Sequence, residues 1–372
     1  MIKSAQKRAI NILAIETSCD ETAAAVLNLT NPFLKPQTKL KFKKTTFPEI
    51  ITLSSIVKSQ ITLHSKMGGV VPEIAARAHV KNILPVIQKA LSTAHCPLST
   101  IDYIAVTAGP GLIPSLLVGV EFAKTLSLAS NKPIIPVNHM LGHLYSPFGK
   151  ISYKISSHQD IKSLFPNISL IVSGGHTTLV LMTDKKKYKV IGQTVDDAAG
   201  EAFDKVAKLL NLPYPGGPEV SKLAENSKNP IDFPRPMINS KNYNFSFAGL
   251  KTAVLYYVQS LAIKQLSLTA KQDICAGFQN AAIDVLISKT MRAAKEYGAK
   301  SVSLSGGVSA NTSLRNKLKT ESEKLKIKFF VPPLHLSTDN AEMIGMAAAF
   351  MLYNGYKPKS YKLIKADPNL TL

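Results

Sequence analysis

The sequence predicts an α/β protein made of two similar halves with a cleft between them. Residues 12–26 (ILAIETSCDETAAAV) and 170–181 (LIVSGGHTTLVL) follow one plan, an apolar strand, a turn of small polar residues and a second apolar strand. Each pattern predicts a hairpin whose turn presents N–H groups and hydroxyls, which suit phosphate. Strand and helix units also follow each hairpin. A duplicated domain suited to nucleotide chemistry is therefore expected.

The first half continues with a strand, a glycine turn and a helix. In order, these elements are residues 101–108, 109–111 and 112–129,. A short strand is expected at 132–137, and Asn138 is suited to cap a helix that begins at His139,. Residues 146–166 show no clear period, and we expect them to bridge to the second half.

The second half is expected to be mostly helical after its hairpin, from residue 197 to 264. A further helix, a strand, a glycine turn and two helices should follow: residues 270–297, 301–304, 306–307, a helix from about 310, and 341–353,. The last helix is rich in Ala and Met. This alternation of strands and helices completes the expected second copy.

Composition and charge describe a globular chain with a strongly basic surface. The 372 residues allow two or three domains, and 45% hydrophobic content is enough for buried cores,. The net charge of +21 would attract a polyanion such as nucleic acid,. Since five of the basic residues are arginines, a lysine-rich surface that serves solubility remains the alternative. The densest basic stretch, residues 35–44 (KPQTKLKFKK), is expected to be a solvated insertion.

The cysteines and the apolar segments point to a cytoplasmic protein. Cys19, Cys96 and Cys275 have neither paired nor C-x-x-C spacing, which predicts no disulfide framework and no thiolate metal site. No segment approaches the roughly 18 uninterrupted apolar residues of a membrane helix, and the opening MIKSAQKRA is too short for a transit peptide,. We therefore expect a reducing compartment and no membrane association.

A histidine pair is the first candidate for chemistry. His139 and His143 are one helical turn apart, so both side chains can reach one metal ion,. A surface or capping role is the alternative, and a third ligand would favour the metal. Asp339 precedes the last helix, where a carboxylate can also simply offset the helix dipole,. Met140 stands where an H-E-x-x-H peptidase would need glutamate, which argues against proteolysis,.

An acidic helix start and two glycine loops are further candidates. Residues 196–205 (DDAAGEAFDK) fit a solvated helix start, with Glu201 and Lys205 paired at i,i+4,. That helix leads into the stiff loop 212–218 (LPYPGGP), whose glycines permit close approach of a ligand,. Residues 305–311 (SGGVSAN) form a strand end, a glycine turn and a helix start, which favour an anion or nucleotide,.

Ten motifs together resemble one family, the TsaD family. In order they are residues 16–22 (ETSCDET), 67–73 (MGGVVPE), 109–112 (GPGL), 139–143 (HMLGH), 173–177 (SGGHT), 196–205 (DDAAGEAFDK), 214–218 (YPGGP), 245–252 (FSFAGLKT), 306–311 (GGVSAN) and 338–341 (TDNA). The resemblance implies an actin-like, sugar-kinase-like (ASKHA) fold of two ribonuclease-H-like lobes. The first lobe would be residues 10–145, completed by 337–372, and the second 146–336.

The resemblance also implies the site residues. One divalent metal ion per chain, iron(II) or zinc, would be held by His139, His143 and Asp339. The positions that match the adenylate-binding residues of the family are Ile171, Val172, Ser173, Gly174, Gly175, Asp204, Gly217, Ser221 and Asn311. Asp204 would grip ribose hydroxyls and Asn311 would lie near the adenine. Ser221 stands where many relatives carry an aspartate that binds the ribose.

The implied activity is transfer of a threonylcarbamoyl group from threonylcarbamoyl-AMP to the exocyclic amine of the tRNA adenosine 3′ of the anticodon. The implied partners, besides tRNA, are a non-catalytic TsaB-like subunit and a TsaE-like ATPase if the protein is bacterial. An ATP-dependent small-molecule kinase and a non-catalytic nucleotide-binding scaffold of the same fold are the alternatives. The histidine pair argues against both, because phosphoryl transfer calls for magnesium between carboxylates and phosphates and a scaffold needs no ligand set.

Overall fold

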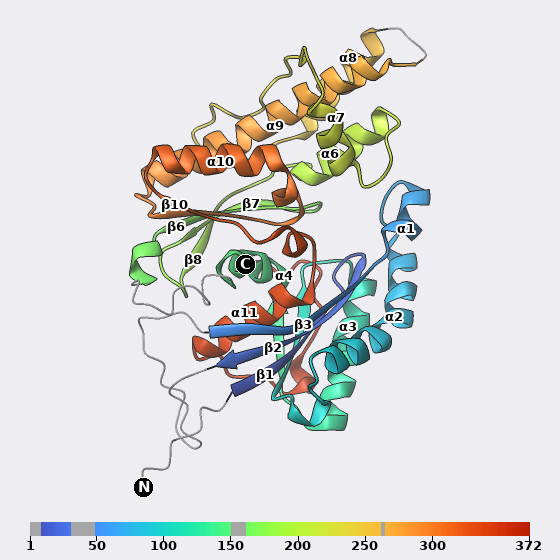
Figure 1. Ribbon diagram of the computed structural model, residues 1–372, viewed down its shortest axis with the longest axis vertical. Coiled ribbons are helices and arrows are strands. Elements are labelled where there is room, and N and C mark those ends of the chain that lie inside the picture. The colour runs from blue at the N-terminus through green and yellow to red at the C-terminus, as the bar shows by residue number, and fades with distance from the viewer. Residues whose placement is uncertain (1–8, 31–48, 150–160, 262–264) are drawn as a thin grey trace. The chain divides into compact units, whose positions relative to one another are not determined.

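The computed structural model describes residues 9–30, 49–149, 161–261 and 265–372 and divides into two compact units (Figure 1). The first comprises Met1–Gln60, Val70–Ser163 and Thr338–Leu372, and the second comprises Ile61–Gly69 and Leu164–Ser337. The basic stretch at 35–44 lies outside the described residues. Each unit contains one five-stranded sheet.

The sheet of the first unit has the order β3-β2-β1-β4-β5. Its strands are β1 (Ala9–Glu16), β2 (Glu21–Thr30), β3 (Glu49–Ser59), β4 (Tyr103–Gly109) and β5 (Ile134–Asn138). β2 runs antiparallel to both β1 and β3, as the first predicted hairpin requires. β4 is parallel to β1, and β5 is parallel to β4. The neighbouring strands β1 and β4 are almost fully buried because helices cover both faces of the sheet,.

Helices α2 (Pro72–Thr93) and α3 (Ile113–Ser130) cover one face of this sheet, and α11 (Ala341–Tyr353) covers the other (Figure 1). Side chains alternate across a strand, so Val26 packs with α2 and α3 while Leu27 meets α11, where Gly345 leaves room for it. The short helix α4 (His139–Tyr145) follows β5 directly and contacts α11. The predicted start of α4 at His139 and both predicted boundaries of α11 are confirmed.

The sheet of the second unit repeats the first. Its strands are β6 (Asn167–Val172), β7 (Thr177–Met182), β8 (Tyr188–Gln193), β9 (Ser301–Ser305) and β10 (Lys328–Phe330). Their order is β10-β9-β6-β7-β8. Read from the β8 edge, β8-β7-β6-β9-β10 matches β3-β2-β1-β4-β5 strand for strand. β6, β7 and β8 are antiparallel neighbours, whereas β9 and β10 run parallel to β6. The predicted duplicated α/β fold is confirmed.

The helices of the second unit are α1 (Ile61–His64), α6 (Ala199–Leu209), α7 (Gly216–Ala224), α8 (Ala248–Ser260), α9 (Leu268–Glu296) and α10 (Thr312–Lys324). Across both units, 3-10 turns occupy η1 (Ser65–Met67), η2 (Leu98–Thr100), η3 (Ser146–Phe148), η4 (Ile161–Leu164), η5 (Gly307–Ala310), η6 (Leu334–Leu336) and η7 (Tyr361–Leu363). The core of the second unit contains edge-to-face aromatic pairs such as Phe203 and Phe278.

The predicted helical stretch at 197–264 is wrong in its middle. Residues 225–247 form no helix, because Pro230, Pro234 and Pro236 remove backbone donors and restrict the residues before them. The segment contributes Phe233, Tyr243 and Phe245 to the core instead. The helix expected from about residue 310 begins at Thr312, because residues 307–310 form η5 and Asn311 caps α10.

Among the described residues, α3 is the one helix long and apolar enough to cross a membrane by length and composition. A core helix passes the same test. Leu116, Val120 and Ala123 of α3 are fully buried, and the helix packs on β4 and α2. This side of α3 therefore belongs to the core of the first unit.

Candidate metal centre and nucleotide-binding loops

The two histidines are positioned by a capped helix at the end of β5. Asn138 Oδ1 accepts hydrogen bonds from the N–H groups of Met140 (2.8 Å) and Leu141 (3.4 Å), which satisfies two free donors of the first turn,. His139 and His143 therefore lie one above the other on one face of α4, with ring centroids 4.8 Å apart. Both side chains are buried.

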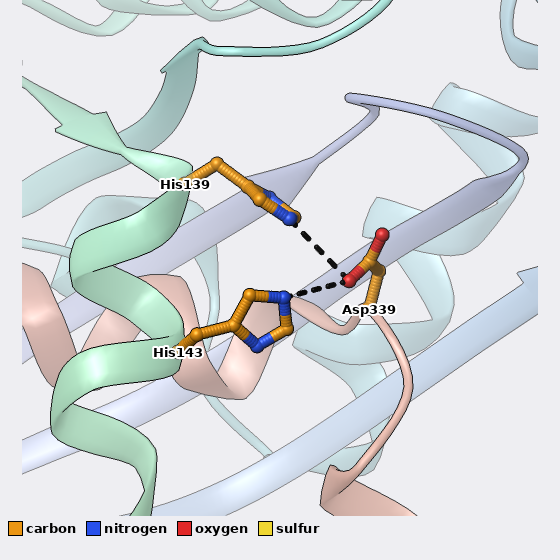
Figure 2. Close-up of side chains that lie close together, drawn as sticks. All are labelled: His139, His143 and Asp339. Atoms are coloured by element: carbon orange, nitrogen blue, oxygen red, sulfur yellow. Dashed lines mark ion pairs between the residues drawn. The ribbon is translucent and has the colours of Figure 1, made fainter. Parts of the chain in front are cut away.

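Asp339 converges on the same point from a distant part of the chain. Asn340 caps α11 by accepting from the N–H of Met343 (2.9 Å), so Asp339 lies just outside the helix. Its Oδ1 is 3.4 Å from His139 Nε2 and 3.2 Å from His143 Nε2 (Figure 2). A carboxylate that only offset the dipole of α11 would not need this orientation toward the two rings.

The three side chains fit a divalent metal ion. Two imidazole nitrogens and one carboxylate oxygen suit zinc or iron(II), and the three ligand atoms lie within 4.8 Å of one another. Ligands about 2.0–2.2 Å from a tetrahedral ion are about 3.3–3.5 Å apart, close to both separations from Asp339. Among the described residues, neither buried ring nitrogen of His143 makes a hydrogen bond of good geometry, and the one charged group beside Nε2 is Asp339, at 3.2 Å. Buried polar atoms are normally satisfied, so this histidine fits a ligand better than a structural residue.

A second layer of polar groups holds the other side of the His139 ring. Glu16, at the end of β1, is fully buried, and its Oε2 lies 3.3 Å from His139 Nδ1. Ser18 Oγ lies 3.2 Å from the same nitrogen. Glu16 in turn accepts 2.5 Å hydrogen bonds from the N–H of Ser18 and the hydroxyl of Thr107. A carboxylate behind a metal-binding histidine orients the ring and fixes its tautomer.

The role of Glu16 was missed by the sequence analysis, although it lies within a quoted motif. The available signal was a carboxylate at the end of an almost continuously apolar strand, where burial demands a partner,. The sequence cannot name that partner, because His139 lies in a different element far along the chain.

The charges at this centre reinforce one another. Burial alone would lower the pKa of His139, but the negative charges of Asp339 and Glu16 hold it well above its usual value. Burial alone would raise the pKa values of Asp339 and Glu16. The charge of His139 outweighs burial and holds the pKa of Asp339 well below, and the pKa of Glu16 below, its usual value. Burial, together with Asp20 and Asp339, raises the pKa of Glu21 well above normal. The centre therefore carries surplus negative charge, which favours a cation.

The nine positions expected to bind an adenylate all lie in the second unit. Ile171 and Val172 end β6, and the turn at Ser173, Gly174 and Gly175 follows. Added Cβ atoms at Gly174 and Gly175 would meet nothing within 4 Å, so this backbone is open to approach. Gly306 has φ +86°, and a Cβ there would lie 2.3 Å from the carbonyl oxygen of Val172, so glycine is required where η5 reaches the end of β6,.

Asp204, Gly217, Ser221 and Asn311 form a second group in this unit. Asp204 Oδ1 accepts from the N–H of Gly216 (2.8 Å), which fixes the start of α7, and the backbone at Gly217 is open. Asn311 donates from Nδ2 to Ser221 Oγ (2.9 Å) and to Gln279 Oε1 (2.7 Å). Its Oδ1 accepts from the N–H of Leu314 and caps α10. Gln279 was missed; the signal was one buried amide on the apolar face of α9.

The acidic stretch at 196–205 has largely structural partners. Asp196 accepts from the N–H groups of Phe247 (2.8 Å) and Ala248 (3.3 Å) at the start of α8. Asp197 pairs with Lys205 (2.7 Å) and Lys251 (3.0 Å). Lys205 also makes the predicted i,i+4 pair with Glu201 (2.8 Å). These carboxylates secure the entry to α6 and α8.

Comparison with known proteins gives the family and the fold. The family model described as "TsaD: tRNA N6-adenosine threonylcarbamoyltransferase" matches residues 51–346. The tRNA N6-adenosine threonylcarbamoyltransferase of Thermosipho africanus is 47% identical over 362 residues, which is 97% of this chain and 99% of the relative. The Bacillus subtilis protein of that name is 46% identical over 95% of this chain and 93% of its own length.

A solved structure supports the architecture alone. HypF from T. kodakarensis aligns with a TM-score of 0.60 at 14% identity, over 95% of this chain and 50% of HypF. Such low identity supports the ASKHA architecture but not an activity. The family resemblance inferred from the ten motifs is confirmed by the family match and by both relatives. The chain belongs to the TsaD family of tRNA N6-adenosine threonylcarbamoyltransferases.

Proposed function

We propose that this protein transfers the threonylcarbamoyl group of threonylcarbamoyl-AMP to the exocyclic amine of the adenosine 3′ of the anticodon, in tRNAs that read codons beginning with A. The observation that carries the proposal is the convergence of His139, His143 and Asp339 on one point in a member of this family. The donor is a mixed carbamic-phosphoric anhydride and already activated. The protein therefore needs mainly to orient the reactants and stabilise charge.

The metal would be iron(II) or zinc, held by His139, His143 and Asp339. When bound, it supplies a Lewis acid that can take up the threonyl carboxylate or polarise the carbonyl under attack. The chain's own residues prepare this site, since Glu16 and Ser18 hold the Nδ1 side of the His139 ring so that Nε2 faces Asp339.

The second unit supplies the adenylate-binding residues in this proposal. The open backbone at Gly174 and Gly175 would approach the phosphate, since free N–H groups in such turns bind anions,. Asp204 would bind ribose hydroxyls, and the amide of Asn311, held by Ser221 and Gln279, would lie beside the adenine.

The partners and the compartment belong to the same proposal. Besides tRNA we propose a TsaB-like non-catalytic subunit and a TsaE-like ATPase, working in the cytoplasm. The kinase and scaffold alternatives lose support because a phosphoryl-transfer site calls for carboxylates around magnesium, whereas the centre in the first unit contains two histidines.

Measurement of metal content together with transfer tests the proposal. The protein is supplied with preformed threonylcarbamoyl-AMP, a tRNA transcript and its partner subunits, and the modified nucleoside is quantified by mass spectrometry. His139→Ala, His143→Ala and Asp339→Ala should each lose bound metal and most of the transfer activity while keeping the wild-type circular dichroism spectrum. His335→Ala, a change at an exposed histidine, is the matched control. Full metal content and full activity in His139→Ala would overturn the assignment.

A further inference from the structure

The segment after α11 returns to the metal-binding helix. Within residues 354–372, the N–H of Lys359 donates to the carbonyl of Ile134 at the start of β5 (3.2 Å), and Ile364 enters the core of the first unit. The N–H of Asp367 then donates to the carbonyl of Ala108 at the end of β4 (2.7 Å). We call residues 367–371 the tail.

Glycine at position 109 makes this contact possible. Gly109 has φ +148°, and a Cβ there would lie 1.7 Å from the carbonyl oxygen of Asp367. The N–H of Gly111 donates to the carbonyl of Pro368 at 3.4 Å. The glycine turn at 109–111 therefore contacts the tail directly. The sequence predicted the turn but not this contact.

The last residues of the tail are hydrogen-bonded to Asn138. Asn138 Nδ2 donates to the carbonyl oxygens of Leu370 (3.3 Å) and Thr371 (2.9 Å). The same amide accepts from Met140 and Leu141 through Oδ1, so one side chain joins the tail to the first turn of α4. With both ends of the amide occupied, the χ angles of Asn138 are fixed.

Helix α4 needs this support because it is short. It has seven residues, and isolated helices of that length are unstable in water,. His139 is its first residue, so the direction of the ring depends on the cap immediately before it. Outer contacts of this kind set how well ligand side chains are preorganised for a metal.

We propose that the tail is a positioning element for the metal centre, acting through Asn138 to hold α4 in the geometry that lets His139 and His143 bind the ion. The inference rests on the proposed metal site. It adds that metal affinity depends on backbone carbonyls of residues 370 and 371, which touch neither histidine. The contacts use main-chain oxygens, so the identity of the tail side chains should matter little.

Two variants separate the tail from the cap. Deletion of residues 369–372 removes both acceptor carbonyls but keeps the anchors at Asp367 and Pro368. Asn138→Ser keeps a good helix cap but is too short to reach the tail. The double variant Asn369→Ala/Thr371→Ala keeps every backbone carbonyl and is the matched control.

The measurement is the Zn²⁺ dissociation constant of the full chain, by competition with a chromophoric chelator, alongside the unfolding midpoint of the metal-free protein. We expect the deletion and Asn138→Ser each to weaken Zn²⁺ binding about tenfold, and the control to match wild type. Combining the deletion with Asn138→Ser should add no further loss, because both remove one interaction.

Different patterns of Zn²⁺ affinity would contradict different parts of the proposal. Wild-type Zn²⁺ affinity in the deletion variant, with weak binding in His139→Ala, overturns the tail proposal alone. Losses that multiply in the combined variant overturn it too, because the tail and the cap would then act separately. Wild-type affinity in His139→Ala removes the metal site itself and, with it, the proposed function.

Discussion

Both ring nitrogens of His139 have polar neighbours, and this distinguishes it from an ordinary buried histidine. Nε2 faces Asp339, while Nδ1 faces Glu16 and Ser18. A histidine pair at i,i+4 could not by itself indicate a metal, since surface and capping roles share that spacing. Asp339, from a segment far along the chain, supplies the third ligand that makes the metal reading the better one.

The buried carboxylate of Glu16 gives a direct test of this arrangement. Glu16→Gln keeps the size of the side chain but removes the charge that orients His139, so metal affinity should fall about 10- to 100-fold. Chelator competition measures the dissociation constant. Glu73→Gln, in an exposed pair with Arg77, is the control and should match wild type. Equal affinities for Glu16→Gln and the control would rule out an orienting role.

Asn311 provides the corresponding test in the second unit. Asn311→Asp keeps the acceptor that caps α10 but loses the donor to Ser221 and Gln279. Affinity for a non-hydrolysable adenylate analogue should fall about tenfold, the effect of roughly one hydrogen bond, while metal content stays at the wild-type level. Isothermal titration calorimetry gives the affinity. Asn316→Ala, at an exposed position of α10, is the control; if it and Asn311→Asp bound alike, the nucleotide assignment would fail.

At the scale of elements, local pattern and long-range contact contribute differently. The run rich in Ala and Met at residues 341–353 predicted α11 to the residue. The segment 225–247 misled the prediction because its apolar residues belong to an irregular chain that packs in the core. The tail contact on Asn138 could not be predicted, since it joins a side-chain amide to main-chain carbonyls more than 200 residues away, and main-chain acceptors leave no signature in a sequence.

The irregular segment is tied to α9 by a buried lysine whose titration can be followed. Lys289 donates to Ser240 Oγ (2.7 Å) and to the carbonyl of Asn242 (3.1 Å). Burial, and then the charge of Arg292, lowers the pKa of Lys289 to about 8. The unfolded chain keeps this proton up to about pH 10.4. Because the unfolded state then binds more protons than the native state, the contribution of Lys289 to stability should rise with pH between these two values.

Lys289→Met tests this, because the variant lacks the titrating group. Denaturant unfolding at pH 7, 8, 9 and 10 should show the wild type gaining stability relative to Lys289→Met above pH 8, by at most about 1.4 kcal/mol per pH unit. Lys295→Met, at an exposed position of the same helix, should give a difference that is flat with pH. A flat difference for Lys289→Met as well would mean that Lys289 titrates normally in the folded protein.

At the scale of the whole molecule, one topology serves two purposes. The sheets share the order of their strands and the direction of every pairing, yet the first unit carries the candidate metal centre and the second the loops proposed to bind the adenylate. The sequence revealed the duplication because hairpins are local, with turn and strands in one stretch. The proposed division of chemistry between the copies depends on single residues such as His139 and Asn311, which the repeat does not preserve.

The net charge of +21 belongs to the molecule as a whole and bears on its RNA substrate. Four lysines lie on the segment that leads from α11 to the tail: Lys357, Lys359, Lys362 and Lys365. All four are exposed, and none makes an ion pair with another described residue. This segment ends beside the helix of His139, so phosphates bound along it would bring RNA toward the metal centre.

Replacing these four lysines with Gln should weaken tRNA binding and flatten the slope of log affinity against log salt by about 0.7 to 0.9 per lost phosphate contact. Adenylate binding should not change. A variant with Gln at Lys39, Lys41, Lys43 and Lys44 of the basic stretch removes the same charge and is the matched comparison. We expect the first variant to flatten the slope more, because its lysines lie on the path to the metal-binding helix. Equal flattening by both would assign tRNA attraction to net charge alone, and slopes identical to wild type in both would place the RNA contacts elsewhere on the surface or on partner subunits.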